Sequence, residues 1–398
     1  MMLGMSARTA DSPLALGGEV MALGTSREVR QNVPPLNQVA SASLTGGRGL
    51  GSGEGRRVRT GTLDHSIPLA PGATFRSTAK HGGAMRRPLS AVIAVVLAGC
   101  ASAPAPAPLP RQESHPAAPG GRISSVTEGT GPPLFIIHGG WGDQRSFATS
   151  AKVLSASSTV TRVSIRLHWP NPWPTTDDEA YATYKVATHA ADVAALIQAS
   201  GRAPVDLLGH SYGGLVAAVV ARERPDLVWK LVLVEPTVTW LLRDQPGGEN
   251  LVAGAQRWGE KMLKRARSGE DPAAIVRSIY DDDEPGTFDA FPEARREVLL
   301  ANARTIGPLV ANGPSKVPFT CQDASRMRMP VLIVEGEKTS KGPQMIDSVL
   351  LACVPSSRRA VLPNAGHTIQ YDAPETMARV VAWFLAREAR KWRTGRSW

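Results

Sequence analysis

Hydrophobic residues recur in short continuous runs that alternate with longer amphipathic stretches from about residue 123 onward. A short apolar run bounded by glycine, proline or polar residues is typical of a buried strand. A stretch with apolar residues every three or four positions is typical of a helix. The predicted strands are 133–137, 160–165, 205–208, 231–234, 331–334 and 360–362, and the predicted helices include 184–199, 215–224, 344–353 and 374–392.

Alternation of strands and helices predicts an α/β fold, in which helices cover both faces of a mostly parallel sheet. One short segment, 123–128, precedes the first of these strands, so we expect a reduced first hairpin. Between residues 237 and 329 the alternation stops, and the chain becomes polar, helical in character and punctuated by Pro and Gly. This segment is expected to be a helical cap, inserted after the strand that ends near Glu235.

The amino-terminal region is different in composition. Residues 1–84 are rich in Gly, Ser and Arg and have no helix or strand period, which predicts disorder or an upstream extension from a mis-chosen start codon. Residues 85–99 begin with Met-Arg-Arg and continue with an apolar stretch too short to span a bilayer. These features are typical of a signal peptide that begins at Met85.

This signal peptide is followed by a cysteine, Cys100. Residues 97–100 read Leu-Ala-Gly-Cys and resemble the lipobox of bacterial lipoproteins. The resemblance implies that Cys100 is acylated and becomes the first mature residue, anchored in the cell envelope. No aspartate follows the cysteine, which resembles an address for the outer membrane, on its periplasmic face. Residues 100–122 are rich in Ala and Pro and are expected to form a tether, with the globular domain at 123–398.

A serine occupies the junction between a predicted strand and a predicted helix. Residues 209–213 read Gly-His-Ser-Tyr-Gly, directly after the strand 205–208 and directly before the helix 215–224. Small residues are needed on both sides of Ser211 because the turn is sharp and the strand end packs against the helix start. Such a turn lifts the serine hydroxyl above the sheet and directs helix N–H groups toward the space beside it.

Three features, in this order along the chain, resemble the α/β-hydrolase family. The first is the strand 133–137, which ends in His-Gly-Gly-Trp; the second is the turn at Ser211; and the third is His367, in a loop before the last helix. The resemblance covers residues 123–398. It implies the α/β-hydrolase fold and serine-dependent hydrolysis. Relatives that use an aspartate at the turn, the epoxide hydrolases and haloalkane dehalogenases, are disfavoured by Ser211.

The resemblance assigns roles to residues of this chain. A neutral serine hydroxyl is a poor nucleophile and needs a base, so Ser211 is the expected nucleophile and His367 the expected base. The negative charge that forms on the attacked carbonyl needs donors already in place. These are expected to be the backbone N–H groups of Tyr212 and Gly140, with Trp141 as the competing second donor.

The third member of a triad, the acid, departs from the common pattern. Most relatives carry an aspartate three residues after the glycine that ends the penultimate strand, and here that position is Thr339. Some relatives place the acid after the preceding strand, which in this chain is Glu235. Glu235 is the predicted acid because a carboxylate at that strand end is well placed to orient an imidazole. Glu337 is the alternative.

More than half of the net positive charge lies outside the predicted domain. The chain has 45 Lys and Arg against 35 Asp and Glu, a net charge of +10. Residues 1–99 hold 11 of these basic residues and 5 of the acidic ones, so the rest is only mildly basic, with 34 against 30. A nucleic-acid partner is therefore not expected, and the membrane is expected as a partner only through the anchor at Cys100.

Cysteines and motifs bear on redox state and cofactors. Besides Cys100 the chain has Cys321 and Cys353, and an even number of cysteines in an exported domain predicts a disulfide between them. No metal-ligand spacing and no dinucleotide fingerprint is present in the sequence, so neither a metal nor a cofactor is expected.

These expectations combine into one function. The sequence predicts a serine hydrolase that cleaves an ester-like bond of a small or medium molecule through an acyl-enzyme intermediate. A perhydrolase or carbon–carbon bond hydrolase with the same triad is an alternative. A non-catalytic binding protein on the same scaffold is another, favoured by the irregular acid position alone. The substrate and the oligomeric state are not readable from the sequence.

Overall fold

The structure is a computed structural model that describes residues 110–117, 121–282 and 284–393. The predicted extension at 1–84, the signal peptide at 85–99 and the lipidation position Cys100 lie outside these residues. All of the predicted strands fall within them.

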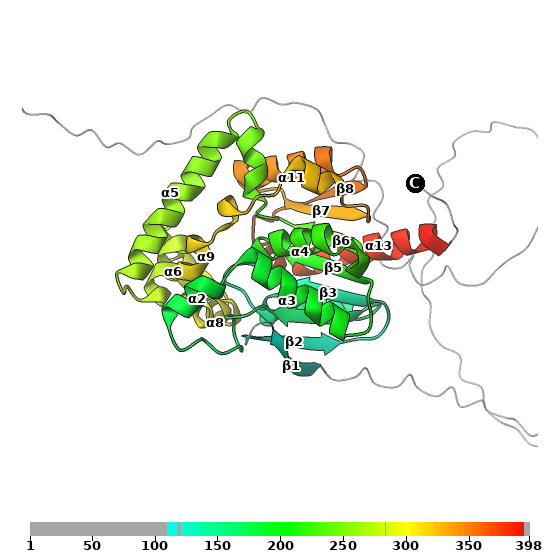
Figure 1. Ribbon diagram of the computed structural model, residues 1–398, viewed down its shortest axis with the longest axis horizontal. Coiled ribbons are helices and arrows are strands. Elements are labelled where there is room, and N and C mark those ends of the chain that lie inside the picture. Colours follow the sequence, from blue (N-terminus) through cyan, green and yellow to red (C-terminus); the bar gives the residue numbers. More distant parts are fainter. Residues whose placement is uncertain (1–109, 118–120, 283, 394–398) are drawn as a thin grey trace, which may run out of the picture. The chain divides into compact units, whose positions relative to one another are not determined.

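An eight-stranded sheet runs through this part of the chain in the order β1-β2-β4-β3-β5-β6-β7-β8 (Figure 1). The pairs β1–β2 and β2–β4 are antiparallel, and the remaining pairs are parallel. The sheet with its flanking helices confirms the predicted fold class, and β3 to β8 correspond to the predicted apolar runs. The strands are β1 (Arg111–Ala117), β2 (Gly121–Glu128), β3 (Pro133–Ile137), β4 (Thr159–Ser164), β5 (Val205–His210), β6 (Val228–Val234), β7 (Val331–Gly336) and β8 (Ser357–Leu362).

The first hairpin differs from the expectation. We expected a reduced hairpin and a tether that extends to residue 122, but residues 111–117 form β1 and pair along their length with β2. The strand is polar, and one of its contacts is a hydrogen bond between His115 Nε2 and Ser125 Oγ at 3.0 Å. An edge strand of this kind is specified by pairing with its neighbour rather than by an apolar run of its own, so the hydrophobic pattern did not reveal it.

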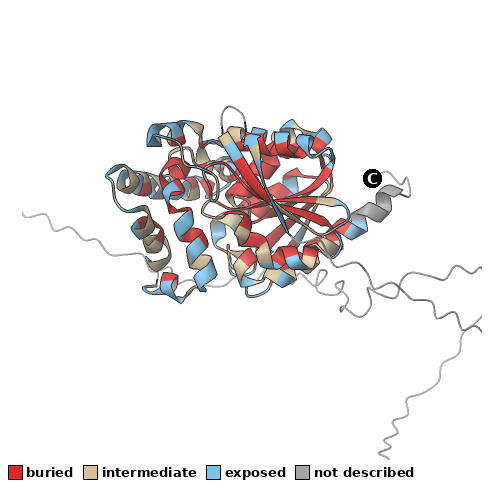
Figure 2. Ribbon diagram, turned by 90° about the horizontal axis from the view of Figure 1, so that it is seen from below, coloured by how far each residue is buried: buried red, intermediate tan, exposed pale blue. Residues whose placement is uncertain are grey.

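Helices cover both faces of the sheet because successive strand residues point to opposite sides. Phe135 and Ile137 of β3 belong to one apolar core, and Leu134 and Ile136 to the other. The first core is covered by α3, α4 and α11, and the second by α1 and α13. Figure 2 shows buried positions concentrated in the strands and on the inner sides of these helices. The bounds are α1 (Ala148–Leu154), α2 (Asp177–Thr183), α3 (Val186–Ala199), α4 (Tyr212–Glu223), α11 (Lys341–Cys353), α12 (Ile369–Asp372) and α13 (Pro374–Arg393).

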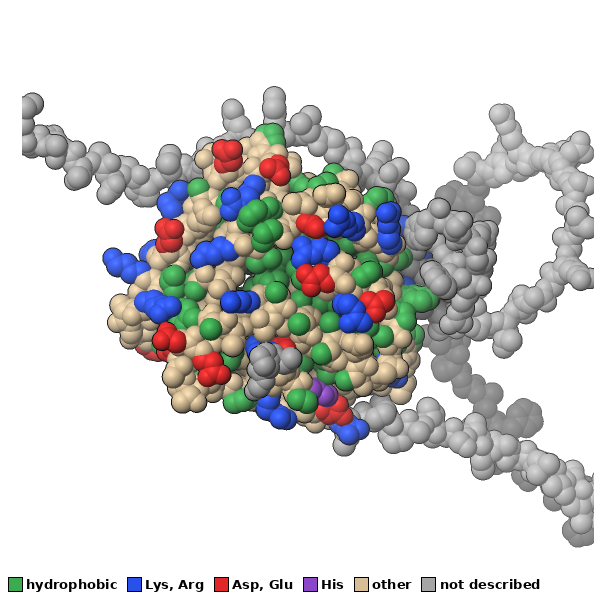
Figure 3. Space-filling model, in the orientation of Figure 1, with side chains coloured by type: hydrophobic (Ala, Val, Ile, Leu, Met, Phe, Trp, Pro, Cys, Tyr) green, Lys and Arg blue, Asp and Glu red, His purple; other side chains and the backbone are tan. Residues whose placement is uncertain are grey.

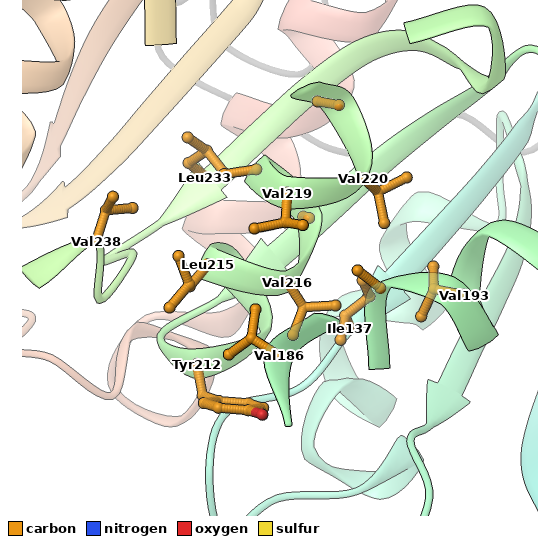
Figure 4. Packing of buried hydrophobic residues seen from close by; sticks show 14 of the residues in the cluster. Ile137, Val186, Val193, Tyr212, Leu215, Val216, Val219, Val220, Leu233 and Val238 are labelled. Atoms are coloured by element: carbon orange, nitrogen blue, oxygen red, sulfur yellow. The ribbon is translucent and has the colours of Figure 1, made fainter. Parts of the chain in front are cut away.

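Helix α4 is the most deeply buried of these helices. Its residues from Tyr212 to Ala221 are all buried. Figure 4 shows Val216 and Val220 near Ile137 of β3, and Val219 near Leu233 of β6. A helix held this firmly gives its first residue, and the serine before it, a fixed position at the sheet edge.

The chain leaves the sheet between β6 and β7 and forms a group of helices. Helix α5 packs against α9, and its residues Val252 and Met262 are buried. Figure 1 shows α5, α6, α8 and α9 gathered to one side of the sheet. We refer to the segment from Thr237 to Met329 as the cap. Its helices are α5 (Gly248–Arg267), α6 (Pro272–Asp281), α7 (Thr287–Ala290), α8 (Glu293–Ala301), α9 (Ile306–Ala311) and α10 (Cys321–Ser325), preceded by the 3-10 helix η4 (Thr239–Asp244).

A disulfide bond ties the end of the cap to the sheet layer. It joins Cys321, the first residue of α10, to Cys353, the last residue of α11. Because α11 packs on β7 and β8, the bond holds the returning end of the cap against the main domain. Within the described ranges, no helix has the length and apolar character needed to cross a bilayer.

The surface drawn in Figure 3 carries charges of both signs. Lys and Arg side chains are interspersed there with Asp and Glu rather than gathered into one patch. Several pairs are close enough to be ion pairs, including Arg277 with Asp289 and Arg304 with Asp177. Both pairs are largely exposed, and exposed pairs contribute little to stability.

Candidate active site

Ser211 lies at the sharp turn between β5 and α4. Its backbone has a φ of 52° and a ψ of −118°. Residues other than glycine rarely adopt a positive φ of this kind. A Cβ atom on Gly209 would collide with the carbonyl oxygen of Gly213, and one on Gly213 would collide with the carbonyl oxygen of His138. The glycines on both sides of Ser211 are therefore required by close backbone contacts.

His367 reaches Ser211 from the loop after β8. Its Nε2 lies 3.0 Å from Ser211 Oγ. The loop is closed by Asp372, whose carboxylate accepts a hydrogen bond from the Gly366 N–H at 3.0 Å. The His367 side chain is 39% exposed, so it is open to the space above the serine.

Glu235 contacts the other nitrogen of this imidazole. Its Oε2 lies 3.1 Å from His367 Nδ1, and its side chain is fully buried. The carboxylate accepts two further hydrogen bonds, from Gly336 N–H at 2.7 Å and from Thr339 Oγ1 at 2.7 Å. These donors compensate for the burial of a negative charge. Glu235 itself has a positive φ of 48°, directly after β6.

The alternative acid, Glu337, makes a different contact. Its Oε2 accepts a hydrogen bond from the backbone N–H of Asn364 at 3.0 Å. The residue is exposed, on the loop after β7. The structure therefore brings Glu235, and not Glu337, to the imidazole.

Thr339 lies at the position where most relatives carry the acid. Its hydroxyl donates to Glu235, as described above, and the residue is buried. The carboxylate thus comes from the end of β6, while the usual position supplies a hydrogen-bond donor to it. The sequence showed that Thr339 could not act as the acid, but gave no indication of this contact.

His210 also contacts the histidine loop, and sequence reasoning overlooked it. Its Nε2 lies 2.9 Å from the carbonyl oxygen of His367, to which it donates a hydrogen bond. Burial lowers the pKa of His210 to about 3, so the ring is neutral. It therefore fixes the backbone of His367 without adding a charge. Its place at the end of β5, directly before the serine, was the available signal.

The candidate oxyanion donors surround Ser211. Tyr212 is the first residue of α4, and a first N–H has no acceptor within its own helix. Gly140 and Trp141 lie in the turn after β3, which is closed by a hydrogen bond from Gly142 N–H to the Gly139 carbonyl at 3.1 Å. Both residues line the cavity above Ser211, so the choice between them as second donor stays open.

Two buried histidines shape this turn. His138 Nδ1 lies 2.8 Å from the Gly139 carbonyl oxygen, and His168 Nδ1 lies 2.7 Å from that of Gly142. Because His138 Nε2 accepts a hydrogen bond from the Ile165 N–H, its Nδ1 must carry the proton. Burial lowers the pKa of both histidines, which therefore act as neutral donors that fix the turn.

A cavity of about 490 Å³ opens between the sheet edge and the cap. Ser211 and His367 lie in its lining. Its volume is within the usual range for a small-molecule site. The cap contributes apolar and aromatic side chains together with polar and charged ones such as Glu260 and Lys316. Trp258 lies edge-on to Trp141, with 6.3 Å between the ring centroids. Lining residues from the cap include Trp258, Leu263, Tyr280, Leu299, Leu309 and Val310.

A second buried carboxyl lies behind Glu235. Asp347 on α11 is fully buried, and neither of its oxygens has a hydrogen-bond partner among the described residues. Burial, reinforced by the charges of Glu235 and Glu335, raises the pKa of Asp347 to about 9. At neutral pH this group is therefore protonated and adds no negative charge beside Glu235. In the described part of the chain, no group of His, Cys, Asp and Glu side chains could hold a metal ion.

The fold and this arrangement define a class of protein. A family profile described as the alpha/beta hydrolase fold matches residues 132–374, which is more than half of the chain. The chain therefore belongs to the α/β-hydrolase family and is a hydrolase.

The individual relatives that we compared have low sequence identity to this chain. The chain is 25% identical over 272 residues to the mouse (Mus musculus) sn-1-specific diacylglycerol lipase ABHD11, an alignment that covers 65% of this chain and 82% of the relative. It is also 25% identical to haloalkane dehalogenase 2 of Mycobacterium tuberculosis, over 66% of this chain and 90% of that protein. Among solved structures, a thermophilic esterase from Thermogutta terrifontis has a TM-score of 0.55 at 22% identity, covering 70% of this chain and 99% of that one. The structural likeness shows the fold alone.

Proposed function

We propose that this protein is a serine hydrolase that cleaves an ester-like bond of a small or medium molecule through an acyl-enzyme intermediate. One observation carries the proposal. Ser211, His367 and Glu235 form a continuous chain of hydrogen bonds, 3.0 Å and 3.1 Å long, at the base of the cavity. A nucleophile, a base and an orienting acid in this order are the arrangement used for acyl transfer.

Acylation follows from the positions of these atoms. Ser211 Oγ attacks the ester carbonyl carbon, and its proton passes to His367 Nε2. Glu235 stabilises the imidazolium that forms. The negative oxygen receives hydrogen bonds from the N–H groups of Tyr212 and of Gly140 or Trp141. When the carbon–oxygen bond to the alcohol breaks, the leaving alcohol takes the proton from His367.

Deacylation repeats these steps with water. His367 removes a proton from a water molecule, which attacks the acyl carbon and forms a new carbon–oxygen bond. The bond to Ser211 then breaks, the serine oxygen regains a proton from His367, and the carboxylic acid departs. The same groups thus act in both halves of the reaction.

The relatives support an ester bond as the target. They include a protein named as a diacylglycerol lipase, a name that indicates action on an ester. The dehalogenase among the relatives has a name that indicates different chemistry. Relatives of that kind use an aspartate at the turn, whereas this chain has Ser211, so we favour ester hydrolysis.

Labelling with a fluorophosphonate probe tests this proposal. We expect the purified protein to be labelled and to hydrolyse short para-nitrophenyl esters, and the Ser211→Ala variant to do neither. Labelling without ester turnover would replace the esterase assignment with the perhydrolase or carbon–carbon hydrolase alternative. Failure of the probe to label the folded protein would favour a non-catalytic binding protein.

We propose further that the protein is a lipoprotein of the bacterial cell envelope, anchored through Cys100 at the outer membrane. The support is the signal-like segment 85–99 with its Leu-Ala-Gly-Cys ending. The test is fractionation of cells that carry the natural protein or Cys100→Ser. The natural protein should be found with membranes and carry lipid, and the variant should lack lipid and leave the membrane fraction. Absence of lipid from the natural protein would refute the anchor.

A further inference from the structure

A buried asparagine of the cap contacts the turn at residues 139–143, which we refer to as the oxyanion turn because it carries both candidates for the second oxyanion donor. Asn302 follows α8 directly and is 1% exposed. Its Nδ2 donates hydrogen bonds to Asp143 Oδ2 at 2.8 Å and to the Val298 carbonyl oxygen at 2.7 Å. Its Oδ1 accepts a hydrogen bond from the Trp169 N–H at 2.8 Å. The amide thus joins the cap to two loops of the main domain.

Asp143 carries this contact into the turn. It is fully buried, and its Oδ1 accepts a hydrogen bond from the Arg145 backbone N–H at 2.8 Å. Its own backbone N–H donates to Ser146 Oγ at 3.2 Å. These two bonds cap the short 3-10 helix η2 (Gln144–Phe147), which follows the turn. The carboxylate therefore fixes the backbone at the end of the oxyanion turn.

Two further cap residues contact the middle of the turn. Thr305, the last residue of the 3-10 helix η5 (Ala303–Thr305), is buried. Its hydroxyl donates to the Asn302 carbonyl oxygen at 2.7 Å and also lies 3.3 Å from the Gly140 carbonyl oxygen. Leu309 of α9 packs against the same glycine, since a Cβ atom on Gly140 would lie 2.7 Å from Leu309 Cδ1. The cap thus contacts the oxyanion turn both in its middle and at its end.

These contacts bear on the direction of the donor N–H groups. In a trans peptide group the carbonyl and the N–H point in opposite directions, so a contact that fixes one also fixes the other. The Gly139 carbonyl shares a peptide group with the Gly140 N–H, and it is held by His138 of the main domain. The Gly140 carbonyl shares a peptide group with the Trp141 N–H, and it faces Thr305 of the cap. The oxyanion turn is therefore held from both sides.

We infer that Asn302 is a positioning residue for the oxyanion turn. Together with Thr305 it holds the turn so that its donor N–H faces the oxygen that becomes negative. Such donors stabilise an oxyanion because they are aligned before the reaction begins. The inference rests on the proposed function and adds a role for the cap in stabilising the transition state. Neither Asn302 nor Thr305 lines the cavity, so binding of the uncharged substrate does not depend on them directly.

The test compares a transition-state analogue with a ground-state analogue. A trifluoromethyl ketone with a butyl chain is attacked by Ser211. A bond forms between the serine oxygen and the ketone carbon, the carbonyl π electrons move to the ketone oxygen, and the serine proton passes to His367. The adduct thus carries an oxyanion. The secondary alcohol obtained by reduction of this ketone has a similar shape but forms no oxyanion. Inhibition constants of both compounds are measured, together with kcat and KM for para-nitrophenyl butanoate.

The full chain is compared with its variants. Asn302→Leu removes the hydrogen bonds of the side-chain amide, and Thr305→Val removes a hydroxyl while it keeps the shape of the side chain. Asn312→Leu is the matched control. The Asn312 side chain also joins the cap to the main domain, because its Nδ2 donates to the Tyr181 carbonyl oxygen at 2.8 Å. That contact is with α2 and not with the oxyanion turn. The end point of fluorophosphonate labelling counts the folded active sites of each variant.

We expect Asn302→Leu to lower kcat by roughly 10- to 100-fold with KM nearly unchanged, because small displacements of catalytic groups are costly. The inhibition constant of the ketone should rise by a similar factor, and that of the alcohol should stay the same. Thr305→Val should change kcat and the ketone constant in the same directions by roughly twofold to tenfold, as for one hydrogen bond. Thr305→Ser should restore both, and Asn312→Leu should leave both unchanged.

Other outcomes separate the two proposals. If Asn302→Leu leaves kcat and the ketone constant as they were, or weakens the ketone and the alcohol equally, the positioning role is refuted and the hydrolase stands. An equal effect of Asn312→Leu would also refute this role, because the cause would then be a general loosening of the cap. Should Asn302→Leu not fold, an unchanged ketone constant in Thr305→Val would overturn the inference. If the natural protein neither hydrolyses the ester nor is inhibited by the ketone, the proposed function itself fails.

Discussion

Thr339 donates a hydrogen bond to Glu235, with 2.7 Å between Thr339 Oγ1 and Glu235 Oε2. The two residues follow neighbouring parallel strands, β6 and β7. The same carboxylate oxygen lies 3.1 Å from His367 Nδ1. Thr339 therefore holds the carboxylate in the orientation that the imidazole requires. Most relatives have an aspartate at the position of Thr339, and in this chain Glu235 supplies the carboxylate instead.

The assignment of the acid can be tested by a pair of isosteric changes. Glu235→Gln removes the charge that stabilises the imidazolium, so we expect kcat/KM for esters to fall by about 1,000-fold or more. Glu337→Gln is the matched control and should change kcat/KM by less than about twofold, because its carboxylate bonds to a loop N–H rather than to His367. If only the Glu337 change abolishes turnover, Glu235 is not the acid.

The contribution of Thr339 can be separated from that of Glu235. Thr339→Val keeps the shape of the side chain but removes the donor to the buried carboxylate. We expect kcat to fall by about tenfold, the effect of one hydrogen bond to a charged group, while KM changes little. Thr339→Ser retains the hydroxyl and should retain most of the activity. Equal losses of kcat in Thr339→Val and Thr339→Ser would mean that the hydrogen bond does not cause the effect.

Asp347 should make the stability of the protein depend on pH. Its pKa is about 9 in the folded state, above that of an unfolded aspartate, so folding is disfavoured once the unfolded chain loses this proton. The penalty is absent at low pH and grows between about pH 4 and pH 9. Asp347→Asn mimics the protonated form. Urea unfolding should therefore show that the variant gains stability over the natural protein by up to about 1.4 kcal/mol per pH unit in this window.

The same series contains its own control. Near pH 3 the natural protein and Asp347→Asn should have nearly equal free energies of unfolding, because Asp347 is then largely protonated in both the folded and the unfolded state. A difference between the two proteins that stays constant from pH 5 to pH 8 would show that the buried carboxyl does not keep its proton.

The disulfide should stabilise the cap against the main domain. Cys321 and Cys353 close a loop with a sequence separation of 32 residues, which restricts the unfolded chain. Replacement of both by serine should lower the free energy of unfolding by about 3 kcal/mol, measured by urea denaturation. Neither cysteine is one of the proposed catalytic residues, so the double variant should still be labelled at Ser211 by the fluorophosphonate at low temperature. If the natural protein has two free thiols under non-reducing conditions, the bond is absent.

Most of the fold was readable from the hydrophobic pattern because the central strands of a parallel sheet are buried on both faces. Such strands appear as continuous apolar runs, and β3 matches the predicted residues 133–137 at both ends. The strand β1 was missed for the complementary reason. Its residues are largely polar and half-exposed, and it exists through its pairing with β2.

Local sequence was enough to predict the turn at Ser211, because a strand, flanking glycines and a helix are adjacent in the chain and act through local sterics. It also identified His367 by its loop and order. It favoured Glu235 over Glu337, but it could not show which carboxylate reaches the imidazole, because both residues follow strands at the same sheet edge. Two features of the tertiary structure bring Glu235 to the imidazole. Its backbone has a positive φ of 48°, and its side chain contacts His367. Its carboxylate also accepts hydrogen bonds from Gly336 and Thr339, about a hundred residues further along the chain. Contacts over such sequence distances arise only when β6 and β7 pair, so they leave no local pattern to read.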